Sequence, residues 1–308
     1  MNSATLVVSL PDEHLAEALG TAPSGVEYVH WDLTSRSPQE QLDIVVTPYV
    51  GALARIHALH DVRTRLVQSQ TLGYDGIAEV LPAGVVYANA TSVHETSTAE
   101  FALALVLASQ RGLDGFVRAA EHGTWAPAWR PSLADRTVLL IGYGGVGRAI
   151  ESRLAPFEVR LVRVARHARV DGATPVHAVS ELATLLPTAD IVILAVPLDD
   201  STTHLVDEPF LASMRDGALL VNVARGRVVD TAAMMRHASS GRLRFALDVV
   251  DPEPLGDAHP LFALANVMVT PHVGGASSAM APRIARLVRT QIERMAVGDE
   301  PLNVIFRT

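Results

Sequence analysis

Gly142-Tyr143-Gly144-Gly145-Val146-Gly147 is the stretch that decides the fold of this chain. It follows a short apolar run, 137–141, and precedes a helix-like segment. In a loop of this kind the first glycine permits a tight turn, the second lets the backbone approach a pyrophosphate, and the third allows the helix to pack closely on the strand. The start of the helix then attracts the phosphates. Because the pattern also arises by chance in glycine-rich turns, the flanking sequence has to decide whether it binds a dinucleotide.

Apolar runs of strand length alternate with helix-length segments from residue 137 onward. Near-continuous Val, Ile and Leu runs between helices are typical of a parallel sheet that is covered on both faces. The runs are 137–141, 159–165, 190–196, 218–224, 244–250 and 267–270, and the expected helices are 145–154, 180–186, 208–214 and 230–239. Asp230 is placed to cap the last of these helices and Gly241 to end it. The pattern predicts a Rossmann doubly wound parallel sheet.

A second, smaller alternation precedes the glycine loop and predicts another α/β unit. Its strand-like runs are 5–10, 26–31, 43–47, 66–69 and 85–88. The apolar helix expected over 96–110 is too short to cross a bilayer. A helix over 283–295 and an apolar piece at 302–306 follow, and this piece is expected to return to the first unit. The sequence therefore predicts an α/β protein in which a Rossmann domain, 99–276, is inserted into a smaller flavodoxin-like α/β domain formed by 1–98 and 277–308.

The composition narrows the classes of function. The 308 residues suffice for two ordinary domains, and the formal net charge of −8 comes without a basic stripe. We therefore expect a small-molecule ligand, with no nucleic acid and no membrane as partner. The first ten residues lack the pattern of a signal peptide, so a cytoplasmic protein is expected. The chain has no cysteine and no lysine, which excludes thiolate and Schiff-base chemistry, and no metal-ligand spacing appears, so no metal is expected.

Arg225, Glu253 and His272 follow three successive strands of the predicted Rossmann sheet. Ligands bind outside the carboxyl ends of the strands in such sheets, so these side chains are expected to converge beside the dinucleotide. Each also has an ordinary explanation: a capping arginine, a solvated loop glutamate, and one of twelve histidines.

The three groups are chemically complementary. A hydride that leaves a reduced nicotinamide needs a carbonyl carbon to attack, and the carbonyl oxygen then needs a proton from a positioned acid. His272 suits the acid, Glu253 would favour its imidazolium and orient the ring, and Arg225 can hold a substrate carboxylate in a bidentate pair.

The motifs GYGGVG, NVARG, ALDVVDPEPL and TPHVGGAS resemble, in order and spacing, the signature of the D-2-hydroxyacid dehydrogenases. QTLGYDGI and STAEFALAL resemble that family's substrate domain, so the resemblance runs over essentially the whole chain. It implies that Arg225, Glu253 and His272 are the catalytic set. It also implies that the amides of Leu72 and Gly73 bind the substrate carboxylate. Residues implied to line the dinucleotide, besides the glycine loop with Val146, are Pro197, Thr202, Val223, Ala224, Asp248 and Gly274.

The resemblance implies reversible reduction of a small 2-oxo acid, such as glyoxylate or hydroxypyruvate, to a D-2-hydroxy acid, in a homodimer. Two alternatives stay open: a dinucleotide-sensing regulator or corepressor on the same scaffold, and a dehydrogenase of the same family that acts on another oxyacid. Pro197 and Thr202 also fit an ordinary turn after a strand. Tyr49 either walls the substrate pocket or caps a strand end, and His94 either touches substrate or lies on the surface.

The residues after the second Rossmann strand favour NADP(H) over NAD(H). A unit selective for NAD places an acid about 20 residues past the glycine loop to bind the ribose 2′-hydroxyl. This chain has no acid there, but has Arg163 and Arg166 instead. Arginines suit a 2′-phosphate by charge and by geometry. The open alternative is that these arginines only solvate the surface.

Overall fold

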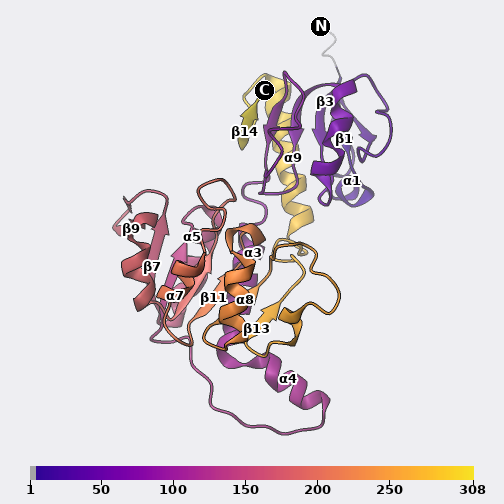
Figure 1. Ribbon diagram of the computed structural model, residues 1–308. Helices are drawn as coiled ribbons and strands as arrows, with labels where there is room; N and C mark the ends of the chain where they lie inside the picture. Colours follow the sequence, from indigo (N-terminus) through magenta and orange to yellow (C-terminus); the bar gives the residue numbers. More distant parts are fainter. Residues whose placement is uncertain (1–4) are drawn as a thin grey trace. The chain divides into compact units, whose positions relative to one another are not determined.

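The computed structural model describes residues 5–308, which divide into two compact units (Figure 1). Unit 1 comprises residues 5–94 together with Ser277–Thr308, and unit 2 is the continuous segment Glu95–Ala276. The first boundary between the units lies between residues 94 and 95, four residues before the boundary expected from the sequence, between 98 and 99. The second boundary lies between residues 276 and 277, as expected. The helices of the described segment include none that is long and apolar enough to cross a membrane.

Unit 1 is built on a six-stranded sheet in the order β14-β5-β4-β3-β1-β2. All neighbouring pairs are parallel except β14 and β5, which are antiparallel. The strands are β1 (Leu6–Leu10), β2 (Val26–His30), β3 (Gln41–Val46), β4 (Arg63–Gln68), β5 (Val86–Ala88) and β14 (Val304–Arg307). The predicted return of the apolar piece at 302–306 to this unit is confirmed, because β14 extends its sheet.

The first and the last of the α-helices in unit 1 bury apolar side chains in its core, and the short second one has no buried residue. These helices are α1 (Glu13–Leu19), the short α2 (Ala52–Arg55) and the long α9 (Met280–Val297). Ile284 and Val288 of α9 lie in the same buried cluster as Val8 and Ile44 of the sheet. Asp12 caps α1 by accepting a hydrogen bond from the Leu15 amide, 2.9 Å long. Unit 1 therefore draws its core from both ends of the described chain.

Unit 2 is built on an eight-stranded sheet in the order β13-β12-β11-β10-β6-β7-β9-β8. All neighbouring strands are parallel except the terminal hairpin of β8 and β9. The strands are β6 (Thr137–Ile141), β7 (Arg160–Ala165), β8 (Arg169–Asp171), β9 (Thr174–Ala178), β10 (Ile191–Leu194), β11 (Leu219–Asn222), β12 (Arg244–Leu247) and β13 (Val267–Val269). The helices are α3 (Glu95–Arg111), α4 (Leu113–Glu121), α5 (Gly145–Leu154), α6 (Leu182–Leu185), α7 (Glu208–Ser213) and α8 (Thr231–Ser239). The predicted doubly wound parallel sheet is confirmed.

Two buried clusters cover the sheet of unit 2. One contains Ala99, Leu105 and Val106 of α3 with Ile150 of α5, and the other contains Phe210 and Leu211 of α7 with residues of α8. Burial of apolar surface on both faces explains why the central strands are almost entirely Val, Ile and Leu.

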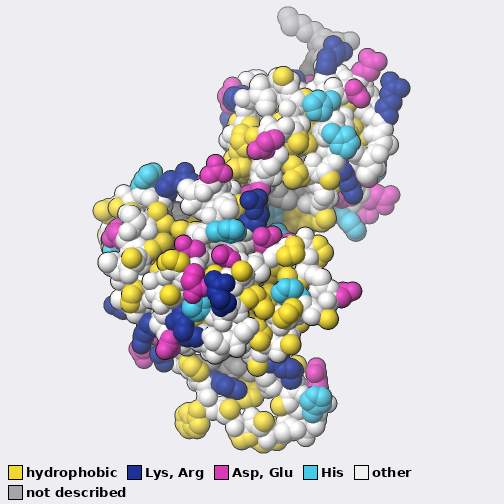
Figure 2. All heavy atoms as spheres, viewed as in Figure 1, with side chains coloured by type: hydrophobic (Ala, Val, Ile, Leu, Met, Phe, Trp, Pro, Cys, Tyr) yellow, Lys and Arg dark blue, Asp and Glu magenta, His cyan; other side chains and the backbone are white. Residues whose placement is uncertain are grey.

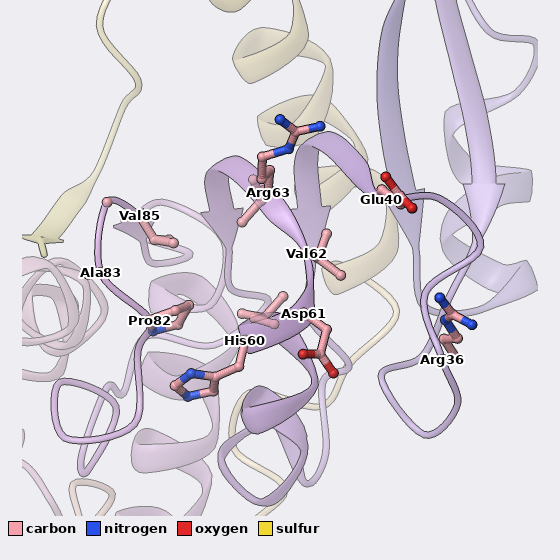
Figure 3. Close-up of a pocket in the computed structure, with 12 residues that line it drawn as sticks. Arg36, Glu40, His60, Asp61, Val62, Arg63, Pro82, Ala83 and Val85 are labelled. Carbon is pink, nitrogen blue, oxygen red and sulfur yellow. The ribbon is translucent and has the colours of Figure 1, made fainter.

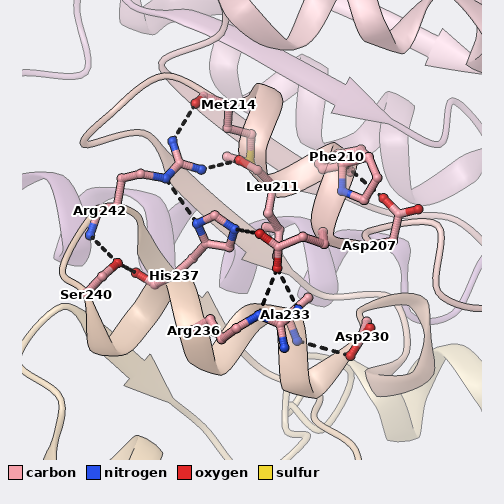
Figure 4. A network of polar contacts seen from close by, with 12 residues as sticks. Asp207, Phe210, Leu211, Met214, Asp230, Ala233, Arg236, His237, Ser240 and Arg242 are labelled. Carbon is pink, nitrogen blue, oxygen red and sulfur yellow. Dashed lines mark hydrogen bonds and ion pairs between the residues drawn. The ribbon is translucent and has the colours of Figure 1, made fainter.

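A polar network joins α7 to α8 and the turn after α8 (Figure 4). His237 Nε2 lies 2.8 Å from Glu208 Oε1, and Arg242 donates to His237 Nδ1 over 3.0 Å and to the Met214 carbonyl over 2.8 Å. Asp230 caps α8 as predicted, with its carboxylate accepting from the amides of Ala232 and Ala233. The network fixes the helices that flank β11 and therefore the loop that carries Arg225.

An arm formed by α4 and residues 122–131 extends from the body of unit 2 (Figure 1). Its apolar side chains are unusually exposed: Trp125 is 94% and Trp129 102% exposed, and Leu113 and Val117 are about half exposed. Figure 2 shows hydrophobic side chains on the surface of this arm. Helix α3, in contrast, buries Leu105 and Val106 in the core.

The structure also differs from the predicted elements. The runs 190–196, 218–224 and 244–250 leave the sheet after Leu194, Asn222 and Leu247, because the residues that follow turn into loops. The predicted helix 180–186 is a 3-10 turn, Val179–Glu181, followed by the single-turn α6.

Candidate active site

The glycine loop lies between β6 and α5, and its geometry fits a dinucleotide. Gly142 has φ +104°, and a Cβ there would lie 2.3 Å from the Ala195 carbonyl oxygen. A Cβ at Gly147 would lie 2.1 Å from the Gly142 carbonyl oxygen, so this glycine lets α5 pack on the loop. A Cβ at Gly144 would meet only open space in front of the start of α5. This open space beside a helix N-terminus is where a pyrophosphate can approach the backbone.

Tyr143 anchors the loop through charged neighbours. Its hydroxyl donates to Glu151, and Glu151 in turn accepts two bonds from Arg163, one of them 2.9 Å from Nε. Burial, followed by the neighbouring Glu151, raises the pKa of Tyr143, and Arg163 holds the pKa of Glu151 below its usual value. The guanidiniums of Arg148 and Arg169 lie 4.9 and 5.9 Å from the Tyr143 ring centroid. These contacts hold the loop in place.

The two arginines predicted to bind a 2′-phosphate lie in different surroundings. Arg163 is mostly buried, with 17% of its side chain exposed, and is paired with Glu151 in α5. Arg166 directly follows β7, is 58% exposed, and pairs with Asp199 and Ser201 of the loop after β10. The structure therefore does not bring Arg163 and Arg166 together as a pair around one open site.

The loop after β10 carries Pro197 and Thr202. Thr202 is buried, and its hydroxyl donates to the Pro197 carbonyl over 2.7 Å and accepts from the Asp199 amide over 2.8 Å. Pro197 is exposed. Thr202 therefore shapes the loop, and Pro197 presents its ring on the loop surface.

Arg225 stands on a turn that Asn222 and Gly226 define. Asn222 accepts from the Ala224 amide over 3.0 Å and donates to the Arg225 carbonyl over 2.9 Å. A Cβ at Gly226 would lie 1.8 Å from the Val250 carbonyl oxygen, so only glycine lets this turn approach the segment after β12. Arg225 is half-buried and donates to the Ala224 carbonyl over 2.7 Å. Val223 and Ala224 are nearly fully buried beneath it.

Glu253 and His272 form a pair beyond the ends of β12 and β13. Glu253 Oε1 lies 2.5 Å from His272 Nδ1, and both side chains are about 40% exposed. A carboxylate only accepts hydrogen bonds, so Nδ1 carries a proton and Nε2 faces away from Glu253. His272 has φ +53°, and its amide donates to the Asp248 carbonyl over 2.8 Å.

Asp248 organises the chain on both sides of His272. It is 3% exposed, and its carboxylate accepts from Thr270 Oγ1, the Val273 amide and the Gly274 amide over 2.8 to 2.9 Å. Sequence reasoning assigns Asp248 and Gly274 to the dinucleotide. In the structure both carboxylate oxygens of Asp248 accept hydrogen bonds from the segment 270–274.

Of the residues predicted to bind substrate, Leu72, Gly73 and Tyr49 lie in loops of unit 1. The Leu72 and Gly73 carbonyls accept 2.9 Å bonds from Asn89 Nδ2 and Thr71 Oγ1. The amide hydrogen of a trans peptide points opposite to its carbonyl, so the Gly73 amide points away from Asn89.

Tyr49 stacks on His94, with ring centroids 5.6 Å apart. The alternative that His94 lies on the surface is wrong, because it is 4% exposed with Nε2 2.6 Å from the Gln70 carbonyl.

A hollow of about 620 Å³ in unit 1 is lined by Arg36, Glu40, His60, Asp61 and Arg63 among others (Figure 3). These residues lie at the amino end of β4, which starts at Arg63, whereas Leu72 and Gly73 follow its carboxyl end. The hollow is therefore separate from the candidate site. Among residues 5–308 no group of three His, Asp or Glu side chains is arranged to hold a metal ion.

Sequence reasoning missed Asn222, Gly226 and the positioning role of Asp248. Asn222 and Gly226 stand inside the quoted motif NVARG, but their contacts are with turn amides and with a segment more than 20 residues away. No short-range signal reports such contacts.

A parallel sheet with a glycine-rich strand-to-helix turn, and a histidine–carboxylate pair on neighbouring strand ends, define a nicotinamide-dependent oxidoreductase. Comparison with known proteins agrees: residues 103–274 match the model of the D-isomer specific 2-hydroxyacid dehydrogenase NAD binding domain. The chain belongs to this family and is an NAD(P)-dependent 2-hydroxyacid dehydrogenase.

The chain is similar to a glyoxylate reductase of Pyrococcus horikoshii, 34% identical over 80% of this chain and 77% of that protein. It is also similar to a glyoxylate reductase of Pyrococcus furiosus, 34% identical over 89% of this chain and 88% of that protein. A D-isomer specific 2-hydroxyacid dehydrogenase from Xanthobacter autotrophicus Py2, solved with NADPH and MES, has a TM-score of 0.82 and 26% identity over 99% of this chain and 98% of that chain. An NADPH-dependent glyoxylate/hydroxypyruvate reductase of Sinorhizobium meliloti, solved with NADP and malonate, has a TM-score of 0.81 and 25% identity over the same shares.

Proposed function

We propose that this protein reduces a small 2-oxo acid, such as glyoxylate or hydroxypyruvate, to the D-2-hydroxy acid, and uses NADPH in preference to NADH. The observation that carries the reaction is the 2.5 Å contact between Glu253 and His272. The similarity to the glyoxylate reductases and to the glyoxylate/hydroxypyruvate reductase supports the substrate class.

A dinucleotide bound with its pyrophosphate at the glycine loop would supply a hydride from its nicotinamide for the carbonyl carbon. His272 gives its Nε2 proton to the carbonyl oxygen, while Glu253 stabilises the imidazolium and keeps the ring oriented. Arg225 pairs with the substrate carboxylate and draws electron density from the adjacent carbonyl. In unit 1, we assign the Leu72 and Gly73 amides and Tyr49 to substrate binding. Val223, Ala224 and Gly274 line the dinucleotide.

The preference for NADPH is assigned to Arg166, since its guanidinium is exposed directly after β7. Arg163 is already paired with Glu151, which leaves the 2′-phosphate to Arg166. Two of the solved structures named above hold NADPH or NADP, which supports this assignment. We expect Arg166→Gln to raise the KM for NADPH and to leave the KM for NADH nearly unchanged. Equal changes for both cofactors would contradict the assignment.

The reaction is tested by following oxidation of NADPH and NADH across a panel of 2-oxo acids. Turnover with glyoxylate or hydroxypyruvate is expected. His272→Ala should lower kcat by roughly 10²- to 10⁴-fold with the circular dichroism spectrum unchanged. His14→Ala, at an exposed position of α1, is the matched control. Cofactor binding without turnover on any acid of the panel would favour a regulatory protein instead.

We further propose a homodimer that buries the arm of α4 and residues 122–131. Exposed tryptophans of this kind are typical of protein interfaces. Sedimentation equilibrium of the wild type should give a dimer, and the double variant Trp125→Ser, Trp129→Ser should shift it toward the monomer. A wild-type monomer would refute the proposal.

A further inference from the structure

The ion pair between Arg166 and Asp199 spans the strand that carries the glycine loop. Arg166 follows β7 and Asp199 follows β10, and β6 lies between these two strands in the sheet. The carboxyl ends of all three strands lie at the same edge because the strands are parallel. The pair therefore crosses this edge beside the segment where a dinucleotide is expected to lie.

Asp199 is held for this contact by its own loop. Its Oδ1 accepts from the Ser201 amide over 2.9 Å and from the Ser201 hydroxyl over 2.6 Å, which leaves Oδ2 to accept from Arg166. The Ser201 hydrogen bonds, with help from Arg166, hold the pKa of Asp199 below its usual value. Asp199 is therefore a charged carboxylate at neutral pH.

The guanidinium of Arg166 can exchange one anion for another. The two side chains are 58% and 40% exposed, and an ion pair with this exposure adds little net stability, so it opens easily. A phosphate dianion offers the same guanidinium a stronger, bidentate partner than a single carboxylate oxygen. To bind, however, the phosphate must displace the Asp199 carboxylate from Arg166, and it then remains close to the negative charge of Asp199.

We propose that Asp199 is a specificity-determining residue that weakens discrimination between NADPH and NADH, because it competes with the 2′-phosphate for Arg166. The inference rests on the proposed role of Arg166 in NADPH preference. With a dinucleotide that lacks the 2′-phosphate, Arg166 keeps Asp199 as its partner, and its charge is not left unpaired. The carboxylate thus lowers the affinity for the phosphorylated cofactor and leaves the affinity for the other cofactor unchanged.

Asp199→Asn separates these effects, because the amide oxygen can still accept from Ser201 while the charge is lost. Calorimetry with 2′,5′-ADP and with 5′-AMP reports the ratio of the two dissociation constants without any turnover. The ratio of the dissociation constant for 5′-AMP to that for 2′,5′-ADP should rise roughly three- to tenfold in Asp199→Asn compared with the wild type. This rise should become smaller in high salt. Asp200→Asn removes the same charge from an exposed neighbouring position and should leave the ratio unchanged.

A ratio in Asp199→Asn that equals the ratio in Asp200→Asn would overturn the proposal. An equal gain in the background of Arg166→Gln would also overturn it, because the competition for Arg166 would then play no part. Failure of the proposed cofactor preference looks different: the wild type would bind 2′,5′-ADP and 5′-AMP equally, and Arg166→Gln would change neither affinity.

Discussion

Replacement of Asp248 by Asn is expected to destabilise the loop that carries His272. The carboxylate is 3% exposed and accepts from Thr270, Val273 and Gly274, so an asparagine must turn its NH₂ group toward one of these donors. With the amide oxygen in the Oδ1 position, the bonds from Thr270 and Val273 remain, and the Gly274 amide faces another donor. One charge-assisted bond is lost and one buried donor is left unpaired, which costs about 1.5–3 kcal/mol.

Urea unfolding followed by circular dichroism measures this loss as a lower midpoint at an unchanged slope. Asp257→Asn, at an exposed position, is the control and should stay within about 0.5 kcal/mol of the wild type. Since His272 stands between Thr270 and Val273, we also expect kcat to fall roughly 10- to 100-fold. The NADPH dissociation constant of the variant separates a positioning role from direct contact with the cofactor. An unfolding midpoint equal to that of the wild type would refute the reasoning about the buried carboxylate.

Three further predictions test the site and its supports. Glu253→Gln leaves an acceptor for His272 but no charge, so kcat should fall roughly 10- to 100-fold in steady-state assays, and an unchanged kcat would remove Glu253 from the reaction. Gly226→Ala places a Cβ 1.8 Å from the Val250 carbonyl oxygen and should cost roughly 1–3 kcal/mol in urea unfolding, whereas Gly256→Ala, with nothing within 4 Å, should not. Arg163 lowers the pKa of Glu151 in the folded state. A carboxyl group of this kind stabilises the fold at pH values above its pKa in the unfolded chain, and this stabilisation is lost as the pH falls through its pKa in the folded protein. Glu151→Gln should therefore cost about 1–2 kcal/mol at neutral pH, and the difference from the wild type should shrink below roughly pH 4; a difference that persists in acid would contradict the ion pair as its cause.

Local patterns in the sequence were enough to predict the central strands and the positions of Arg225, Glu253 and His272. Runs of buried Val, Ile and Leu mark β6, β10 and β11, and ligand-binding groups follow the carboxyl ends of such strands. Each of these inferences depends on residues that are close together in the sequence.

Contacts between distant segments could not be predicted in this way. The hairpin of β8 and β9 has no long apolar run, and its turn depends on Gly172 at φ +60°. Arg163 alternates with the buried Val164, but nothing in the sequence indicates that it pairs with Glu151 twelve residues earlier. The sequence also does not show that the Asp248 side chain is engaged by the loop beyond β13.

The split of unit 1 sets an order on synthesis at the ribosome. Unit 2 is a continuous segment, so all of its strands emerge before α9 does. Unit 1 needs Ile284 and Val288 of α9 to cover Val8 and Ile44, and it needs β14 to pair with β5. While unit 2 is being made, the sheet of β1–β5 therefore lacks α9 and β14, and part of its apolar surface stays exposed. During this interval the strands β1–β5 are the part of the molecule most open to chaperones and to aggregation.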